Sequence, residues 1–114
     1  MPERIAEYKL RGFVQDVGGE VLESVPGRIR VRLGGRGGAY PPRGRNSWLS
    51  LSRRAGQIDV ELQLERVDPA RDSLLHITVL MRPTERKTAD EEEWRHRAAI
   101  IYCDLRGYLM GQGG

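Results

Sequence analysis

Three arginines at alternate positions, Arg28, Arg30 and Arg32, are the side chains of this chain best placed to do chemistry. Alternate residues of a strand share one face, so these guanidinium groups are predicted to form a row. Such a row can bind phosphate or an acidic peptide through charge-assisted hydrogen bonds. The alternative is pairing inside the sheet, because acidic residues alternate in the same way between positions 59 and 65.

A second candidate group lies in residues 34–46, where five glycines and two prolines among thirteen residues prevent a regular element. Arginine–glycine segments with an aromatic residue occur in flexible RNA-binding regions. The alternative is a solvated connector whose far end is anchored by an indole ring. The candidate partner-binding residues of both groups are Arg28, Arg30, Arg32, Arg36, Tyr40, Arg43, Arg45 and Trp48.

The remaining reactive side chains form no recognisable catalytic or metal motif. His76 and His96 are far apart in the sequence, and Cys103, the single cysteine, has no neighbouring histidine. Cys103 lies beside an apolar helical stripe, which predicts a small buried side chain. The phosphate-binding patterns G-x-x-x-x-G-K-[ST] and G-x-G-x-x-G are absent. We therefore predict no enzymatic activity, no cofactor and no metal.

Length and charge limit the class of protein. The 114 residues predict a single domain, residues 1–114, with a flexible loop at 34–46. Residues 1–54 hold 11 Lys+Arg against 5 Asp+Glu, a balance of +6, whereas residues 55–114 hold 8 against 11, a balance of −3. The basic half favours an anionic partner. Alternatively, the two halves pack together and neutralise each other.

The cellular location follows from what the sequence lacks. One cysteine excludes an internal disulfide framework and is typical of a reducing compartment. No apolar run reaches 18 residues, and no apolar segment follows the first residues as in a signal peptide. We expect a cytoplasmic protein that does not cross a membrane.

The elements that must position the arginines are predicted from periodicity. Residues 57–66 and 74–82 alternate apolar and polar side chains, and residues 68–72 between them have the composition of a turn. Pro83 ends this hairpin because proline cannot extend a ladder. Residues 20–33 predict two more strands around a turn at 25–27, and residues 47–54 predict a short strand or helical turn.

Two helices frame the strands. Residues 3–17 carry one apolar stripe, and the glycine pair at 18–19 ends that helix. Residues 88–91 match a capping box that starts a C-terminal helix, which stops near Gly111. Its predicted buried stripe is Trp94, Ala98, Ile101, Leu105 and Tyr108. Each strand is apolar on one face only, so both helices are expected on that face of an antiparallel sheet of about four strands. The predicted fold class is therefore an α+β two-layer sandwich.

Two segments also carry a family resemblance. Residues 18–34, which include Val25-Pro26-Gly27, and residues 75–79 with the closing helix resemble a region downstream of the catalytic domain in bacterial serine/threonine protein kinases of the planctomycete type. The chain lacks the H-R-D, D-F-G and V-A-I-K motifs of a kinase catalytic domain. The resemblance implies an accessory domain beside a kinase, without phosphotransfer of its own.

Together these patterns predict a non-catalytic regulatory or protein-interaction domain of a larger signalling protein. Its partner would be another protein or a second copy, bound through the open sheet face or a sheet edge. The alternative is an RNA-binding module that uses the basic segment 28–45, since double-stranded-RNA-binding domains also order their elements as helix, strands, helix.

Overall fold

The structure, a computed structural model, describes residues 2–35, 38–40, 56–68, 70–85 and 91–111. Within these ranges, two helices precede and follow four strands along the sequence. The elements in order are α1 (Glu3–Asp16), β1 (Glu20–Val25), β2 (Arg28–Leu33), β3 (Ile58–Asp68), β4 (Arg71–Pro83) and α2 (Glu91–Gly111). The strands form one antiparallel sheet in the order β1-β2-β3-β4, so the predicted α+β architecture is confirmed.

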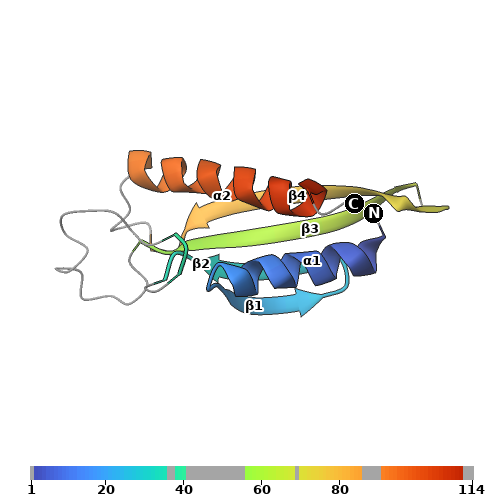
Figure 1. Cartoon of the computed structure of the whole chain (residues 1–114), viewed down its shortest axis with the longest axis horizontal. Helices are drawn as coiled ribbons and strands as arrows, with labels where there is room; N and C mark the ends of the chain where they lie inside the picture. The colour runs from blue at the N-terminus through green and yellow to red at the C-terminus, as the bar shows by residue number, and fades with distance from the viewer. Residues whose placement is uncertain (1, 36–37, 41–55, 69, 86–90, 112–114) are drawn as a thin grey trace.

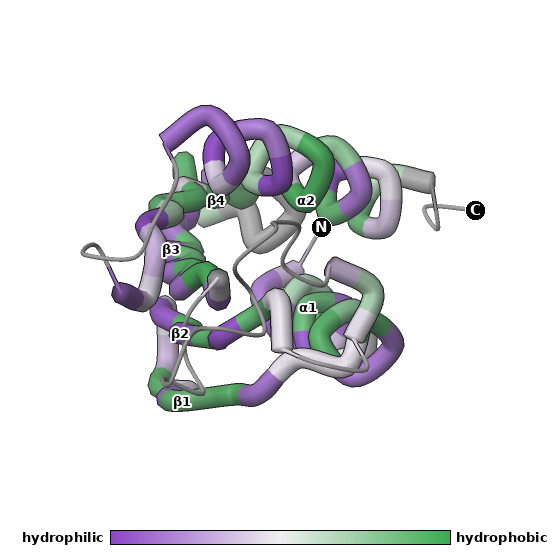
Figure 2. The backbone as a smooth tube through the Cα atoms, turned by 90° about the vertical axis from the view of Figure 1, so that its left-hand side faces the viewer, coloured by the Kyte–Doolittle hydropathy of each residue, from purple (hydrophilic) through white to green (hydrophobic). Residues whose placement is uncertain are grey.

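Both helices cover the same face of the sheet. Figure 1 shows α1 and α2 lying along the strands, and the end view in Figure 2 places the two helices on one side of all four strands. The core lies between these layers because β2, β3 and β4 turn their alternate apolar side chains toward the helices. It comprises Ala6, Leu10, Phe13, Val14, Ile29, Val31, Leu33, Tyr40, Ile58, Val60, Leu62, Leu64, Ile101 and Leu105.

The long hairpin is tighter than the sequence predicted. β3 extends to Asp68 and β4 begins at Arg71, which pairs with it, so the two strands reach into positions 68–72 that were predicted as a turn. A side-chain oxygen of Asp68 accepts a 3.0 Å hydrogen bond from the backbone N–H of Ala70. This local bond satisfies the turn and lets the ladder continue through polar positions that the sequence assigned to a loop. As predicted, β4 ends at Pro83.

The helix ends follow the glycine signals. Beyond α1, Gly18 adopts φ 73°, and the N–H of Gly19 donates to the carbonyl of Val14 at 2.8 Å. Such bonds satisfy the carbonyl groups that a helix C-terminus leaves free. α2 ends at Gly111 as expected. The predicted capping box at 88–91 and the predicted element at 47–54 fall wholly or partly outside the described residues.

The buried stripe of α2 contains a residue that the sequence analysis missed. Ile101 and Leu105 are buried, and the ring of Tyr108 packs edge-on against Phe13 with 5.5 Å between ring centroids. Arg97, one turn before Ile101, is also buried, with 4% of its surface exposed. Since charged side chains rarely enter a core unpaired, its partners must explain its position.

Arg97 joins α2 to two distant backbone segments. Its Nε lies 2.6 Å from a carboxylate oxygen of Glu93. One Nη donates to the carbonyl of Tyr40 at 3.2 Å, and the other donates to the carbonyl of Gly56. Gly34 adopts φ 88° beside this group, and a Cβ there would lie 3.1 Å from the guanidinium and from both carbonyl oxygens. One buried side chain thus ties together the chain on both sides of residues 41–55.

Two glycines inside the helices give a prediction on stability. A Cβ added at Gly107 meets no atom within 4 Å, whereas one at Gly12 lies 2.9 Å from the Tyr108 hydroxyl. We expect Gly107→Ala to raise the free energy of unfolding by about 0.5–1 kcal/mol, because alanine restricts the unfolded chain and favours a helix. We expect Gly12→Ala to raise the free energy of unfolding by less, because its Cβ would press against the Tyr108 hydroxyl. Urea unfolding of both variants measures the difference, and an equal gain would contradict these contacts.

Candidate interaction surface

The sheet face opposite the helices is the candidate surface, and we call it the outer face. The polar residues of the alternating strands lie on this face, and the ladder registers place them opposite one another on neighbouring strands. The charged side chains in its rows are Glu20, Glu23, Arg28, Arg30, Arg32, Asp59, Glu61, Glu65 and Arg82. Five carboxylates and four arginines therefore give these rows a formal charge of −1.

The arginine row lies where the sequence predicted, and its members are paired across strands. Arg28 lies 3.1 Å from Glu23 on β1. Arg30 lies 3.8 Å from Glu23 and 4.0 Å from Glu61 on β3. The alternative of pairing within the sheet, rather than an unpaired cationic row, is therefore what the structure has.

Arg32 and Asp59 form the tightest of these pairs. Two guanidinium nitrogens of Arg32 donate to the two carboxylate oxygens of Asp59 at 2.8 and 3.4 Å, and the Thr84 hydroxyl donates to Asp59 at 2.8 Å. Burial by itself would raise the pKa of Asp59, but the hydrogen bonds from Arg32 and Thr84 outweigh it and lower that pKa below its ordinary value. The pair fixes the register of β2 on β3.

This pair makes stability depend on pH. A carboxyl group with a lowered pKa stabilises the fold above its unfolded-state pKa of about 3.9, and this contribution is lost as pH falls through the folded pKa. We expect Asp59→Asn to have a lower free energy of unfolding than wild type at pH 7, and this difference to become smaller below about pH 4. Urea unfolding of both proteins at pH 7 and pH 3 measures the difference. A difference in free energy of unfolding that is the same at both pH values would contradict the lowered pKa of Asp59.

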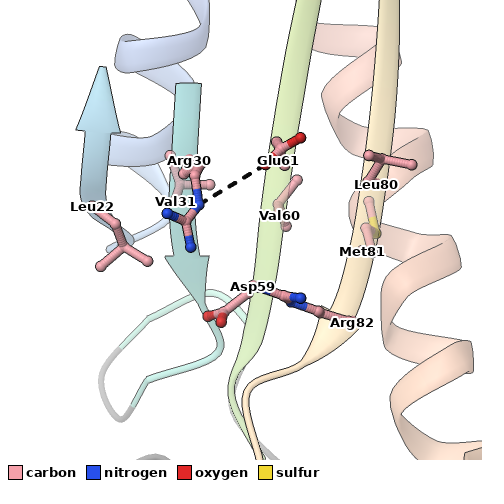
Figure 3. A pocket seen from close by; sticks show the side chains of 9 residues that line it. All are labelled: Leu22, Arg30, Val31, Asp59, Val60, Glu61, Leu80, Met81 and Arg82. Atoms are coloured by element: carbon pink, nitrogen blue, oxygen red, sulfur yellow. Dashed lines mark ion pairs between the residues drawn. The ribbon is translucent and has the colours of Figure 1, made fainter. Parts of the chain in front are cut away.

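A shallow groove of about 250 Å³ crosses the outer face. Figure 3 shows Arg30 and Glu61 facing each other within it, with Leu22 on the β1 side and Leu80 on the β4 side. Leu80 is 49% exposed. A register shift between Val21 and Glu23 allows Leu22 to line the groove beside Arg30. The sequence carried no signal for this bulge, so Leu22 was missed as a site residue. Leu80 was also missed, although its position between the inward-facing Val79 and Met81 indicates that it faces outward.

The candidate residues of the second group are not brought together with the arginine row. Tyr40 is buried, with 8% of its surface exposed, and its hydroxyl donates to Asp104 at 2.8 Å. Burial and this hydrogen bond raise the pKa of Tyr40. Its proposed role as a partner-binding side chain is therefore corrected: the ring packs in the core. Arg36, Arg43, Arg45 and Trp48 lie outside the described residues.

The other reactive side chains stand apart from the outer-face groove. Cys103 is exposed on α2, which corrects the prediction of a small buried side chain, because its position faces away from the Ile101 and Leu105 row. His76 is exposed on β4 and His96 on α2. Among the described residues, no three His, Cys, Asp or Glu side chains are grouped to hold a metal ion.

Neither described helix has an apolar stretch able to cross a bilayer. Protein-family models, curated proteins and solved structures were each compared with the chain, and none matches it.

Proposed function

We propose that this chain is a non-catalytic protein-interaction domain whose contact surface is the outer face of its sheet. The observation that carries the proposal is the one-sided sandwich: among the described residues, both helices lie on one face and the other remains uncovered. A sheet with one solvated face can maintain its core while that face meets a partner. Regulation of a larger signalling protein is the role that the kinase-associated resemblance implies.

The shape and charge of the outer face favour a protein partner. Small-molecule sites are usually enclosed cavities of about 300–1,000 Å³, whereas this groove holds about 250 Å³ and is open. Leu22 and Leu80 offer apolar contacts on either side of the Arg30–Glu61 pair. Apolar contacts with a polar surround are typical of protein interfaces.

The charge pattern disfavours the nucleic-acid alternative on this face. Binding to a phosphate backbone relies on unpaired cations that release counterions. Here Arg28, Arg30 and Arg32 each face a carboxylate, and the rows sum to −1. A titration with duplex RNA at low salt is expected to show no binding through these arginines.

A charge swap tests the proposal without removing the ion pair. In the double variant Arg30→Glu/Glu61→Arg the two charges exchange strands. The net charge and the pair between positions 30 and 61 are preserved, the 3.8 Å pair of Arg30 with Glu23 is lost, and the charge pattern that a partner meets is inverted. A second variant, Leu80→Lys, places a charge on the exposed apolar side of the groove. Leu80 is exposed and Arg30 and Glu61 are partly exposed, so both variants are expected to retain the fold.

The matched control is Tyr8→Lys, since Tyr8 is 80% exposed on α1, away from the outer face. Immobilised wild type and all three variants are incubated with the same cell extract, and retained proteins are quantified by mass spectrometry. We expect a partner retained by wild type and the control but reduced at least about tenfold by both outer-face variants, a loss of about 1.4 kcal/mol. Equal retention by all four proteins would refute the proposed surface.

A further inference from the structure

A second cavity, here called the helix cavity, lies on the helical side of the molecule. It is an open cleft of about 640 Å³ between the C-terminal end of α1, the segment at 39–40 and the middle of α2. It is therefore separate from the outer face, and its contents do not depend on the function proposed for that face. Its lining combines apolar and aromatic side chains with the ionisable groups of Asp16, His96, Arg97, Cys103 and Asp104.

One partly exposed aromatic ring and two carboxylates line this cavity. The ring is that of Tyr108, while Phe13 and Tyr40, which also contribute to the lining, are buried in the core. The carboxylates are Asp16 on α1 and Asp104 on α2, and each accepts a hydrogen bond from a tyrosine of the same lining: Tyr108 donates to Asp16 at 3.4 Å and Tyr40 to Asp104 at 2.8 Å. These bonds hold the carboxylates at the cavity wall and leave each of them further acceptor sites.

The electrostatics of the lining favour a cation. The C-terminal end of α1 carries the negative pole of the helix dipole, and the last turn of this helix contains no basic residue. Arg97 also lines the cavity, but its guanidinium is buried against Glu93 and two backbone carbonyls. His96 is exposed and lies eight residues from Asp104, about 12 Å along the helix axis, so its ring is too far away to pair with that carboxylate.

We propose that the helix cavity binds a guanidinium group, the side chain of an arginine on a partner protein. A guanidinium can stack on an aromatic ring while its N–H groups donate to a carboxylate. This combination matches the Tyr108 ring and the carboxylates of Asp16 and Asp104, which line the same cavity. The site would give the domain a second point of attachment, on the side of the molecule opposite the outer face.

A pair of probes that differ only in charge tests the proposal. Nα-acetyl-arginine amide is titrated into the ¹⁵N-labelled full chain, and Nα-acetyl-citrulline amide, which is neutral and almost the same shape, is the control ligand. We expect amide shifts confined to the helix cavity and an affinity at least about tenfold higher for the arginine compound, because charged hydrogen bonds are the stronger ones. Equal affinities would overturn the proposal.

The single cysteine supplies an independent reading of occupancy. Cys103 is exposed and lines the helix cavity, so bound ligand should slow its alkylation by iodoacetamide several-fold. The arginine compound should protect it and the citrulline compound should not. If the arginine compound binds but leaves the alkylation rate unchanged, the guanidinium is bound elsewhere and the assignment to this cavity is wrong.

Substitutions that remove the cavity's negative charges test which groups bind the guanidinium. Asp16→Asn and Asp104→Asn each remove one charge while keeping an oxygen for the tyrosine hydroxyl, and each should weaken arginine binding about five- to tenfold. The matched control is Glu65→Gln on the outer face, which removes the same charge and should leave affinity unchanged. Thermal melting confirms that each variant is folded. Equal affinity in all three variants would overturn the site.

Discussion

Replacing Arg97 with methionine is expected to lower the free energy of unfolding by about 3–5 kcal/mol. Methionine fills much of the same volume but removes the donors that the carbonyl oxygens of Tyr40 and Gly56 use, and it removes the charge paired with Glu93. Breaking a buried charged network by deleting one member costs more than losing an exposed ion pair. Urea unfolding followed by circular dichroism measures the loss.

Burial, rather than charge alone, causes this effect, and a neighbouring arginine on the same helix provides the control. Arg95 forms an exposed ion pair with Glu91, one turn earlier, at 3.0 Å. Such pairs contribute about 0.3–0.5 kcal/mol, so Arg95→Met should have little effect. If Arg95→Met and Arg97→Met cost the same, Arg97 does not hold the two backbone segments.

Leu62→Ala is expected to lower the free energy of unfolding by about 3 kcal/mol. Leu62 is 1% exposed in the central part of the core, on the face of β3 that both helices cover. Shortening a buried leucine removes apolar contact and leaves a cavity that the surrounding side chains fill only in part. Urea denaturation at neutral pH measures this loss. The dependence of the free energy of unfolding on urea concentration is compared between wild type and variant.

The adjacent residue tests whether only one face is buried. Gln63 follows Leu62 on β3 and is exposed on the outer face. Gln63→Ala should change stability by no more than about 0.5 kcal/mol. A loss from Gln63→Ala comparable with that from Leu62→Ala would mean that the outer face is also packed, which would contradict the two-layer arrangement.

The sequence predicted the layers because the relevant signals are local and repeated. Strict alternation in β2 and β3 requires a one-sided sheet, and the glycines that follow α1 fix its end by their backbone conformation. The pairing of the arginine row was also predicted as one of two alternatives, since acidic residues alternate on β3 as the arginines do on β2. These inferences need only the period of a strand and the signs of the charges.

The remaining features depend on contacts between residues far apart in the chain. Arg97 is 57 residues from Tyr40 and 41 from Gly56, so no short window of sequence contains these two backbone partners. Its one signal was its position four residues before Ile101, on the buried stripe of α2. The bulge that allows Leu22 to line the outer-face groove and the burial of Tyr40 against Asp104 are likewise tertiary effects.

The most direct test of the central claim is to attach a bulky group to the outer face and then measure partner binding. Leu80→Cys/Cys103→Ser carries one thiol on the outer face, and Tyr8→Cys/Cys103→Ser carries one on α1. Each is labelled in the folded state with a maleimide-linked polyethylene glycol, and retention of the partner is measured. We predict rapid labelling at both positions, with binding lost only when residue 80 carries the label. Undiminished binding by protein labelled at residue 80 would contradict the account.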